Sequence, residues 1–340
     1  MVTGGAGFIG SHTVDALLQS GLRVWVLGDL SSGLLSNLSQ WKKNPNLHFK
    51  RGDVTKYKTV ASLAPKVEAI IHLAALVSPN ISIQKPELAH QVNVSGTMNV
   101  LRAGVKHSIR RIVFASSSSV YGDAEERSKI NENAKLDPIT PYGASKLAAE
   151  KYCQAFCKSY GLGTISLRYF NVYGARQSSN PYSGVIAIFA QRLLKGLPPI
   201  IYGDGLQTRD FIHVSDAVNA NLLALRSTKE TGEAVNIGTG RATTIEGLYH
   251  LLARLMARDR ISPRFADARP GDIRASCADI AKARMSLGFE PRIPLRSGLR
   301  LLCEWLDSRQ TVSPQKRRNS QSFLAEPGAE RDGASTQATS

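Results

Sequence analysis

The glycine-rich segment "TGGAGFIG" (residues 3–10) constrains the fold of this chain more than any other feature. It places Gly4, Gly7 and Gly10 three residues apart. The first glycine permits a tight turn, the second lets the backbone approach a pyrophosphate, and the third lets a helix press on the sheet. The helix N-terminus then presents unpaired N–H groups and its positive dipole end to the phosphates. The segment therefore predicts a nucleotide-binding turn between a strand and a helix.

Apolar runs typical of strands alternate with helix-length segments up to about residue 170. Strands are expected at residues 23–27, 47–50, 69–75, 111–116 and 163–170, and helices at 8–20, about 86–107 and 141–160. Such alternation is typical of a parallel sheet with helices on both faces. We therefore predict an α/β fold, with a Rossmann-like doubly wound parallel sheet in a dinucleotide-binding domain at 1–170.

The pattern changes after residue 170 into loops and scattered helices, at about 244–258, 279–286 and 296–308. These helices predict a smaller C-terminal substrate lobe at 171–310. The segment at about 210–240 is expected to rejoin the first domain through a strand at 234–240. Residues 311–340 are rich in Ser, Gln, Gly, Ala and Arg, a composition that predicts a disordered tail.

The nucleotide turn carries two irregularities. Only three residues precede its first glycine, where a strand of about five is usual, so the first strand is a stub or the true start lies upstream. An acidic residue after the second strand should bind the adenosine ribose, about 20 residues beyond the turn. Asp29 lies close to that distance, but Gly28 occupies the position directly after the strand.

The stretch "YGASK" places Tyr142 and Lys146 at i and i+4, on one face of the expected helix. A free tyrosine has a pKa near 10, and about 4 kcal/mol of phenolate stabilisation would bring it towards 7. A nearby ammonium and a positively charged nicotinamide both act in that direction. Upstream, "ASSSSVYG" (115–122) ends a strand where ligands bind in open parallel sheets. The spacing alone also fits a solvated helix face, but together with the glycine turn and the serine run it favours a catalytic pair.

The bulk composition limits the possible ligands. The net charge of +16 indicates attraction for anionic ligands, with a nucleic-acid binder as a weaker alternative because the basic residues are spread along the chain without a nucleic-acid motif. The four cysteines have no histidine at a metal-ligand spacing, so no metal is predicted. No apolar run could span a bilayer and no signal segment is evident, so we expect no membrane association and a cytoplasmic protein with free thiols.

From residue 2 to about 308, the sequence resembles the extended short-chain dehydrogenase/reductase family, and more narrowly the nucleotide-sugar 4-epimerases that act on UDP-hexoses. The motifs that carry the resemblance are "TGGAGFIGSH", "HLAALVS", "NVSGTMNVL", "ASSSSVYG", "PYGASK", "LRYFNVYG", "IYGDGLQTRDFIHV", "NIGTG" and "RPGDI". The resemblance implies NAD as the cofactor and a homodimer formed through the helices at about 86–107 and 141–160.

The resemblance also implies roles for individual residues. Tyr142 would be the base and acid, Lys146 would bind the nicotinamide ribose and tune the tyrosine, and Ser117 would be the hydroxyl partner of Tyr142. The implied cofactor-binding residues are Gly4, Gly7, Phe8, Ile9, Gly10, Asp29, Asp53, Val54, Ala74, Ala75, Asn93, Tyr142 and Lys146. Among them, Asp53 would face the adenine, the two alanines would line the dinucleotide and Asn93 would lie behind it. The implied substrate-binding residues are Ser117, Asn171, Tyr202, Arg209, Arg269 and Ser276.

The resemblance implies that these substrate-binding residues contact different parts of the nucleotide sugar. Asn171 would contact the sugar diphosphate, Tyr202 would pack on the uracil, and Arg209 and Arg269 would clamp the diphosphate with two guanidinium forks. A serine at 276, where glucose-restricted epimerases tend to place tyrosine, implies room for a 2-acetamido group.

The function implied is NAD-dependent 4-epimerisation of a UDP-hexose through a transient 4-keto sugar, on UDP-Glc/UDP-Gal and on UDP-GlcNAc/UDP-GalNAc. Ser118 and Ser119 stand where sugar dehydratases carry an Asp–Glu pair, and decarboxylating relatives carry Glu at the second position, so both reactions are disfavoured. UDP-glucuronate 4-epimerase, or another nucleotide-sugar-modifying relative, remains an alternative. A non-catalytic NAD or nucleotide-sugar sensor on the same fold is a second class of function, although a sensor has no use for the base Tyr142.

Overall fold

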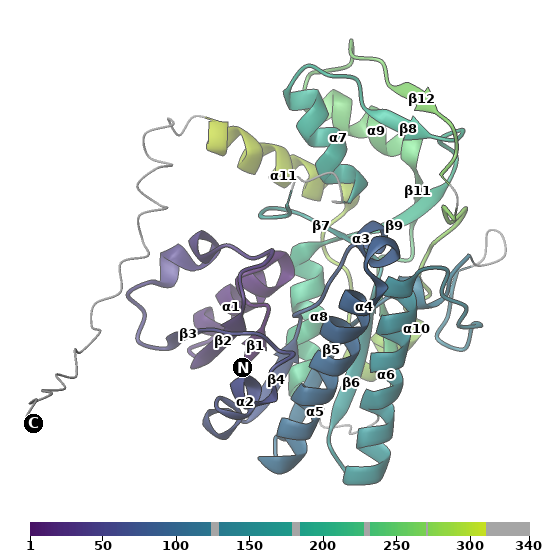
Figure 1. Cartoon of the computed structure of the whole chain (residues 1–340). Helices are drawn as coiled ribbons and strands as arrows, with labels where there is room; N and C mark the ends of the chain where they lie inside the picture. The colour runs from purple at the N-terminus through teal and green to yellow at the C-terminus, as the bar shows by residue number, and fades with distance from the viewer. Residues whose placement is uncertain (124–128, 179–183, 228–231, 270, 311–340) are drawn as a thin grey trace, which may run out of the picture.

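A seven-stranded parallel sheet forms the centre of the computed structural model, which describes residues 1–123, 129–178, 184–227, 232–269 and 271–310 (Figure 1). The strand order is β10-β6-β5-β4-β1-β2-β3, and every neighbouring pair is parallel. The α/β prediction is therefore confirmed. The strands are β1 (Val2–Thr3), β2 (Val24–Gly28), β3 (Leu47–Arg51), β4 (Ala69–His72), β5 (Arg111–Ser117), β6 (Thr164–Tyr169) and β10 (Ala234–Ile237). The predicted tail at 311–340 lies outside the described residues.

Helices cover both faces of this sheet. One face carries α1 (Phe8–Gln19), α8 (Val214–Arg226) and α10 (Ala281–Leu287), and the other carries α2 (Tyr57–Ala61), α5 (Gly96–Lys106) and α6 (Pro141–Tyr160). Because both faces are covered, all residues of β5 and β6 are buried, the polar ones included. The apolar run 112–115 within β5 is the part of this burial that is visible in the sequence.

The first strand is short and central, as predicted. β1 has two residues and pairs with β2 on one side and β4 on the other. Met1 continues the β4 ladder: its amino group donates to the Ala69 carbonyl at 2.7 Å, and its carbonyl accepts from Ile71 N at 2.8 Å. A two-residue strand therefore suffices to place the glycine-rich turn at the middle of the sheet.

The expectation of loops and scattered helices after residue 170 is wrong in part. A three-stranded sheet of order β11-β9-β7 and a two-stranded sheet of β12 and β8 lie at one end of the main sheet (upper part of Figure 1). Their strands are β7 (Asn171–Tyr173), β8 (Ile200–Tyr202), β9 (Thr208–His213), β11 (Ala242–Thr244) and β12 (Arg264–Ala266). Most have three residues, too few for a period of two to be visible in the sequence.

Helices fill the space around these strands. They are α7 (Val185–Leu194), α9 (Ile245–Leu255) and α11 (Leu295–Gln310), which share a separate apolar core with β8 and β9. The sequence pattern missed α7 and α8 but located α9, α10 and α11. The strand expected at 234–240 is confirmed as β10, which pairs with β6.

Short helical segments connect the larger elements. They are α3 (Pro79–Gln84), α4 (Pro86–Ala89), the 3₁₀ turns η1 (Leu35–Trp41), η2 (Ala64–Lys66) and η4 (Ser118–Val120), and the π-helix η3 (His90–Ser95). The helix expected at about 86–107 is therefore three consecutive segments, α4, η3 and α5. In the described part of the chain, no helix has the length and apolar character needed to cross a membrane.

Candidate active site

The glycine-rich turn has the geometry of a phosphate-binding loop. Gly4 has φ +67°, and a Cβ at Gly10 would lie 2.1 Å from the Gly4 carbonyl oxygen, so only glycine lets α1 lie so close to the turn. Gly7 caps α1 without a side-chain hydrogen bond, and the first turn, which begins with Phe8 and Ile9, has no acidic residue. The start of α1 therefore offers backbone N–H groups and a positive dipole end to an anion. This backbone fits the pyrophosphate of a dinucleotide.

The two acidic residues expected at the adenosine end each hold a local turn. Asp29 is exposed, and its Oδ1 accepts from Ser31 N at 2.9 Å and from Ser31 Oγ at 2.8 Å. Asp53 accepts from Thr55 N at 2.8 Å and Thr55 Oγ1 at 2.6 Å. Because a carboxylate has about four lone-pair positions, both residues keep capacity for ribose or adenine donors.

Asn93 fixes the loop that follows β4, where Ala74 and Ala75 lie. Its Oδ1 accepts from Leu76 N at 2.8 Å, and its Nδ2 donates to Leu76 O at 3.1 Å and to Ser145 Oγ at 2.9 Å. The side chain is buried within the π-helix η3, a distortion that often marks functional sites. Asn93 therefore joins this loop to the first turn of α6. Val54 is held in a similar way, because Asn99 Nδ2 donates to its carbonyl at 3.0 Å.

The structure brings Tyr142, Lys146 and Ser117 together where α6 begins and β5 ends. Thr140 caps α6 through a hydrogen bond from Gly143 N to its Oγ1 at 3.2 Å. Tyr142 and Lys146 are both buried, and Lys146 Nζ donates to the carbonyl oxygen of Ala115 in β5 at 2.8 Å. Ser117, also buried, ends β5; its Oγ donates to Ser119 Oγ at 3.1 Å and interacts with the Tyr142 phenol closely enough to act on its pKa.

Burial perturbs both titratable groups of this set. It raises the pKa of Tyr142, and the hydrogen bond with Ser117 acts in the opposite direction. Burial lowers the pKa of Lys146 to about 7. The side chains of the protein by themselves therefore hold Tyr142 as a neutral phenol. A lowered tyrosine pKa, as the sequence suggested, requires positive charge from a charged Lys146 or from the nicotinamide.

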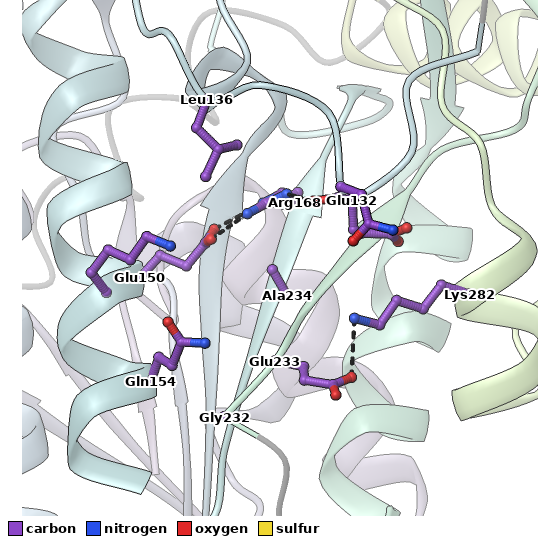
Figure 2. A pocket seen from close by; sticks show the side chains of 11 residues that line it. Glu132, Leu136, Glu150, Gln154, Arg168, Gly232, Glu233, Ala234 and Lys282 are labelled. Carbon is purple, nitrogen blue, oxygen red and sulfur yellow. Dashed lines mark hydrogen bonds and ion pairs between the residues drawn. The ribbon is translucent and has the colours of Figure 1, made fainter. Parts of the chain in front are cut away.

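A buried ion pair joins α6 to β6, one helical turn beyond Lys146 (Figure 2). Glu150, one helical turn after Lys146, accepts from Arg168 Nε at 3.0 Å and from Ser116 Oγ at 2.8 Å. The side chains of Arg168 and Glu150 are 4% and 5% exposed. A polar cavity of about 210 Å³ lies beside them, lined also by Lys151, Gln154, Glu233 and Lys282. The residues that α6 contributes to its lining, Glu150, Lys151 and Gln154, lie two or more turns after Tyr142 in that helix.

The network continues to the opposite side of the site. Arg168 Nη1 donates to Tyr121 Oη at 2.8 Å, and that hydroxyl donates to Asn236 Oδ1 at 2.6 Å. Asn236 Nδ2 donates to the carbonyl of Ile130 at 2.8 Å. Ile130 forms a bridge with Ala278, two residues after Ser276. One chain of hydrogen bonds thus runs from α6 to the segment expected to hold the substrate.

The residues expected to bind the nucleotide sugar lie around β7, β8 and β9. Arg209 donates to Asp272 at 2.6 Å, and the Asp272 amide donates to the carbonyl of Arg269 at 3.1 Å, so the two arginines meet at one turn. The Arg269 guanidinium lies 3.7 Å from the centre of the Tyr202 ring. Asn171 is half-buried at the start of β7 and donates to the carbonyl of residue 210 at 3.3 Å.

Ser276, expected from the sequence, and Asp210, which no sequence motif indicated, organise the same region. Ser276 is buried, and its amide donates to the Thr208 carbonyl at 3.2 Å. The buried Asp210 carboxylate accepts from Thr239 N at 2.8 Å, Gly240 N at 2.9 Å and Ala278 N at 3.1 Å. Asp210 adjoins Arg209 within "QTRDF", but its partners are 29 to 68 residues away in sequence, so the motif alone did not reveal its role.

His72 is a second buried polar residue that supports the site. Its Nδ1 lies 2.6 Å from Thr3 Oγ1, and its Nε2 lies 3.1 Å from Thr97 Oγ1. Thr97 Oγ1 donates to the Asn93 carbonyl and Thr3 Oγ1 accepts from Ala74 N, so the imidazole must donate from Nε2 and accept at Nδ1. A neutral His72 imidazole therefore gives each of these donors and acceptors a hydrogen-bond partner. Burial, aided by Lys146, lowers the pKa of His72 to about 3.

This shift predicts a loss of stability in acid. Between pH 6.5 and 3, the unfolded chain binds a proton at His72 that the folded protein does not, so stability falls as pH drops below 6.5. At pH 5 the free energy of unfolding is therefore lower by about 2 kcal/mol, at about 1.4 kcal/mol for each pH unit below 6.5. Denaturant unfolding at pH 7 and pH 5 measures this effect. Between these pH values, the free energy of unfolding of His72→Gln should fall by about 2 kcal/mol less than that of the wild type. His250→Gln, on an exposed helix face, is the control. An equal pH dependence in wild type and His72→Gln would contradict the assignment.

Comparison with known proteins agrees with this geometry. A family model described as the NAD dependent epimerase/dehydratase family matches residues 1–238. The UDP-glucose 4-epimerase of Mycolicibacterium smegmatis is 37% identical over 301 residues, which cover 88% of this chain and 95% of that protein.

Two solved structures are similar over nearly the whole chain. The UDP-glucose 4-epimerase of Thermotoga maritima with UDP-glucose has a TM-score of 0.86 and 38% identity, covering 91% of this chain and 98% of that one. The UDP-N-acetylglucosamine 4-epimerase of Methanobrevibacter ruminantium M1, in complex with UDP-N-acetylmuramic acid, has a TM-score of 0.86 and 36% identity, covering 91% and 97%.

Proposed function

The chain belongs to the NAD-dependent epimerase/dehydratase family, and on that premise we propose that it interconverts the 4-epimers of a UDP-hexose. The observation that carries the proposal is the meeting of Ser117, Tyr142 and Lys146 where β5 ends and α6 begins. In an open parallel sheet, ligands bind at the carboxyl ends of the strands. A proton-transferring group is therefore placed where a dinucleotide and a sugar could meet.

Tyr142 would act first as a base and then as an acid. It removes the proton of the sugar 4-hydroxyl, while Ser117 holds that hydroxyl by a hydrogen bond, and it later returns the proton to the epimeric oxygen. NAD, which the glycine-rich turn and Lys146 would hold, would supply the hydride acceptor for C4 and the hydride donor to the other face of the transient 4-keto sugar. The reaction has no net redox change, because the hydride and the proton both return to the sugar.

Lys146 is the group that would make Tyr142 a base. Its pKa of about 7 leaves a substantial charged fraction at neutral pH, and hydroxyl acceptors on a bound ribose would favour the charged form further. A buried ammonium near the phenol lowers the tyrosine pKa, which burial alone raises. The same burial that opposes ionisation also strengthens this charge interaction, because little water screens it.

Arg209 and Arg269 would hold the diphosphate while the sugar turns over. The Arg209 guanidinium contacts the Asp272 side chain, and the Asp272 amide is bonded to the backbone of Arg269. A diphosphate would compete with Asp272 for Arg209, since it offers more acceptor oxygens in bidentate geometry. Tyr202, already covered on one side by Arg269, would pack its ring against the uracil.

Replacing Tyr142 by phenylalanine tests the central assignment. Tyr142→Phe keeps the buried ring but removes the proton carrier, so kcat should fall by about 100-fold or more. Epimer formation is followed by NMR, and UDP-sugar binding by calorimetry should change by less than about three-fold, since the hydroxyl acts mainly in the transition state. Tyr152→Phe, on an exposed position of the same helix, is the matched control. Wild-type-like turnover in Tyr142→Phe would refute the role.

The identity of the sugar is tested at Ser276. We propose that this buried serine leaves room for a 2-acetamido group, so that wild type turns over both UDP-Glc and UDP-GlcNAc. Ser276→Tyr should lower kcat/KM for UDP-GlcNAc by at least about ten-fold and that for UDP-Glc by less than about three-fold, a difference in transition-state stabilisation of about 0.7 kcal/mol or more. Equal losses on both substrates would contradict the size argument.

The same assay separates the alternatives. Turnover of UDP-glucuronate with neither UDP-Glc nor UDP-GlcNAc accepted would identify a UDP-glucuronate 4-epimerase. Binding of UDP-sugars without any turnover would identify a sensor.

We also propose a homodimer formed around α6. A groove of about 290 Å³ between η3 and α6 is lined by Pro86, His90, Val94, Pro141, Ala144, Ser145 and Ala148. Nearby, the large apolar side chains of Ile83 and Leu88 are 60% and 37% exposed. Burial of such a surface by a second copy would remove it from water. Light scattering should give twice the chain mass of 36.9 kDa, and Leu88→Arg should shift it towards the single-chain value. A single-chain mass for wild type at micromolar concentration would contradict the proposal.

A further inference from the structure

The ends of β2 and β3 place a glycine directly beside an arginine. Gly28, the last residue of β2, is the register partner of Arg51, the last residue of β3. The Gly28 carbonyl accepts from Gly52 N at 3.0 Å, which continues the ladder past the strand end. These two positions lie at the carboxyl ends of their strands, the edge of the sheet at which dinucleotides bind.

The side chains at both positions face α1. In β2, Val24 and Val26 join the apolar cluster that contains the buried residues of α1. In β3, Phe49 packs against the same cluster. Because successive side chains of a strand point to opposite faces, Gly28 and Arg51 share the face of α1 and the glycine-rich turn.

The space above Gly28 is open, and Arg51 is available to a ligand. A Cβ built on Gly28 would have no heavy atom within 4 Å, whereas one on Gly10 would clash with backbone. The Arg51 side chain is exposed. Among the hydrogen bonds, ion pairs and ring contacts of the described residues, its guanidinium has none. Lys50, its neighbour on the opposite face, donates instead to Ser62 Oγ at 2.7 Å.

The loop that follows β2 places this open position at the adenosine-ribose end of the dinucleotide site. Residues 29–34 turn back onto the glycine-rich turn, where Leu34 N donates to the Ala6 carbonyl at 3.0 Å. A Cβ at Gly33 would lie 2.9 Å from the Ala6 carbonyl carbon and 3.1 Å from Gly7 N, so the loop touches the phosphate-binding backbone. Asp29 lies in this loop, exposed and bonded to Ser31.

The chemistry of the ribose then decides which cofactor fits. A carboxylate at the end of the second strand accepts from a ribose 2′-hydroxyl and repels a 2′-phosphate, whereas a nearby arginine accommodates the phosphate. Gly28 supplies no carboxylate, and Arg51 supplies a guanidinium fork suited to bidentate phosphate binding. Asp29 retains one negative charge in the loop, which favours the 2′-hydroxyl form.

We propose that the dinucleotide site of this chain accepts NADP(H) as well as NAD(H), with the 2′-phosphate lying beside Gly28 and bound by Arg51. The proposal rests on the dinucleotide site and not on the sugar reaction. It predicts relaxed cofactor discrimination, because the residues beside the ribose favour each form in part.

Fluorescence titration of the full chain with NADPH and with NADH tests this, without a sugar present. The two dissociation constants should agree within about ten-fold. Arg51→Gln should raise the dissociation constant of NADPH by about ten-fold or more, the usual contribution of a hydrogen bond to a charged phosphate. It should change the dissociation constant of NADH by less than about two-fold. Gly28→Asp, for which the structure has room, should weaken NADPH binding at least as much and leave NADH binding unchanged.

Two controls test whether the effect on NADPH binding is specific to Arg51 and to the ribose 2′-phosphate. Lys50→Gln removes a positive charge one residue away on the opposite face, so it should leave the NADPH-to-NADH ratio unchanged. Adenosine 2′,5′-bisphosphate and AMP, as competitors of NADPH, report the same subsite without a nicotinamide, and the bisphosphate should compete better in wild type than in Arg51→Gln.

NADPH binding more than about ten-fold weaker than NADH binding in wild type would overturn the proposal, as would an NADPH affinity that Arg51→Gln does not lower. Either result leaves the epimerase assignment standing, because that assignment is judged by sugar turnover.

Discussion

The ion pair between Glu150 and Arg168 is the interaction on which the geometry of the site depends. Both side chains are almost completely buried, and removing one member of such a pair typically costs about 3–5 kcal/mol, because an uncompensated charge remains inside. Hydrogen bonds from Ser116 and to Tyr121 complete the pairing. Since Glu150 lies one turn after Lys146, and Ser116 adjoins Ser117, the ion pair holds α6 against β6, and the Ser116 hydrogen bond holds it against β5.

The same network also connects α6 with the segment around Ser276, where the sugar is proposed to bind. The Tyr121 hydroxyl donates to Asn236 in β10, and the Asn236 side-chain amide donates to the Ile130 carbonyl. Ile130 in turn forms a β-bridge with Ala278. Asp210 binds that segment from β9. A sugar bound among the arginines would thus be held by the same rigid framework that positions Tyr142. This matters because catalysis loses efficiency steeply when reacting groups are misplaced by about 1 Å.

The two positions proposed to set cofactor and sugar preference lie away from this framework. Gly28, proposed for the adenosine end, has open space and an exposed arginine beside it. Ser276, proposed for the sugar end, is buried against β9. Neither takes part in the Glu150–Arg168 network through its side chain. Under the proposals made for Gly28 and Ser276, single substitutions at these positions would change ligand preference while leaving the Glu150–Arg168 network in place.

The sequence by itself determined the features that depend on local spacing. The glycine interval of three indicated the phosphate turn, apolar runs located the main strands, and the i, i+4 interval put Tyr142 and Lys146 on one helix face. Only the tertiary structure decided the short strands β7–β9, the role of Asp210, and the joining of Tyr121 to Asn236, which are 115 residues apart in sequence. It also decided the direction of the pKa shifts, with Tyr142 raised and Lys146 lowered. The physical reason is that desolvation and long-range hydrogen bonding depend on which segments cover a group, and no local pattern encodes that.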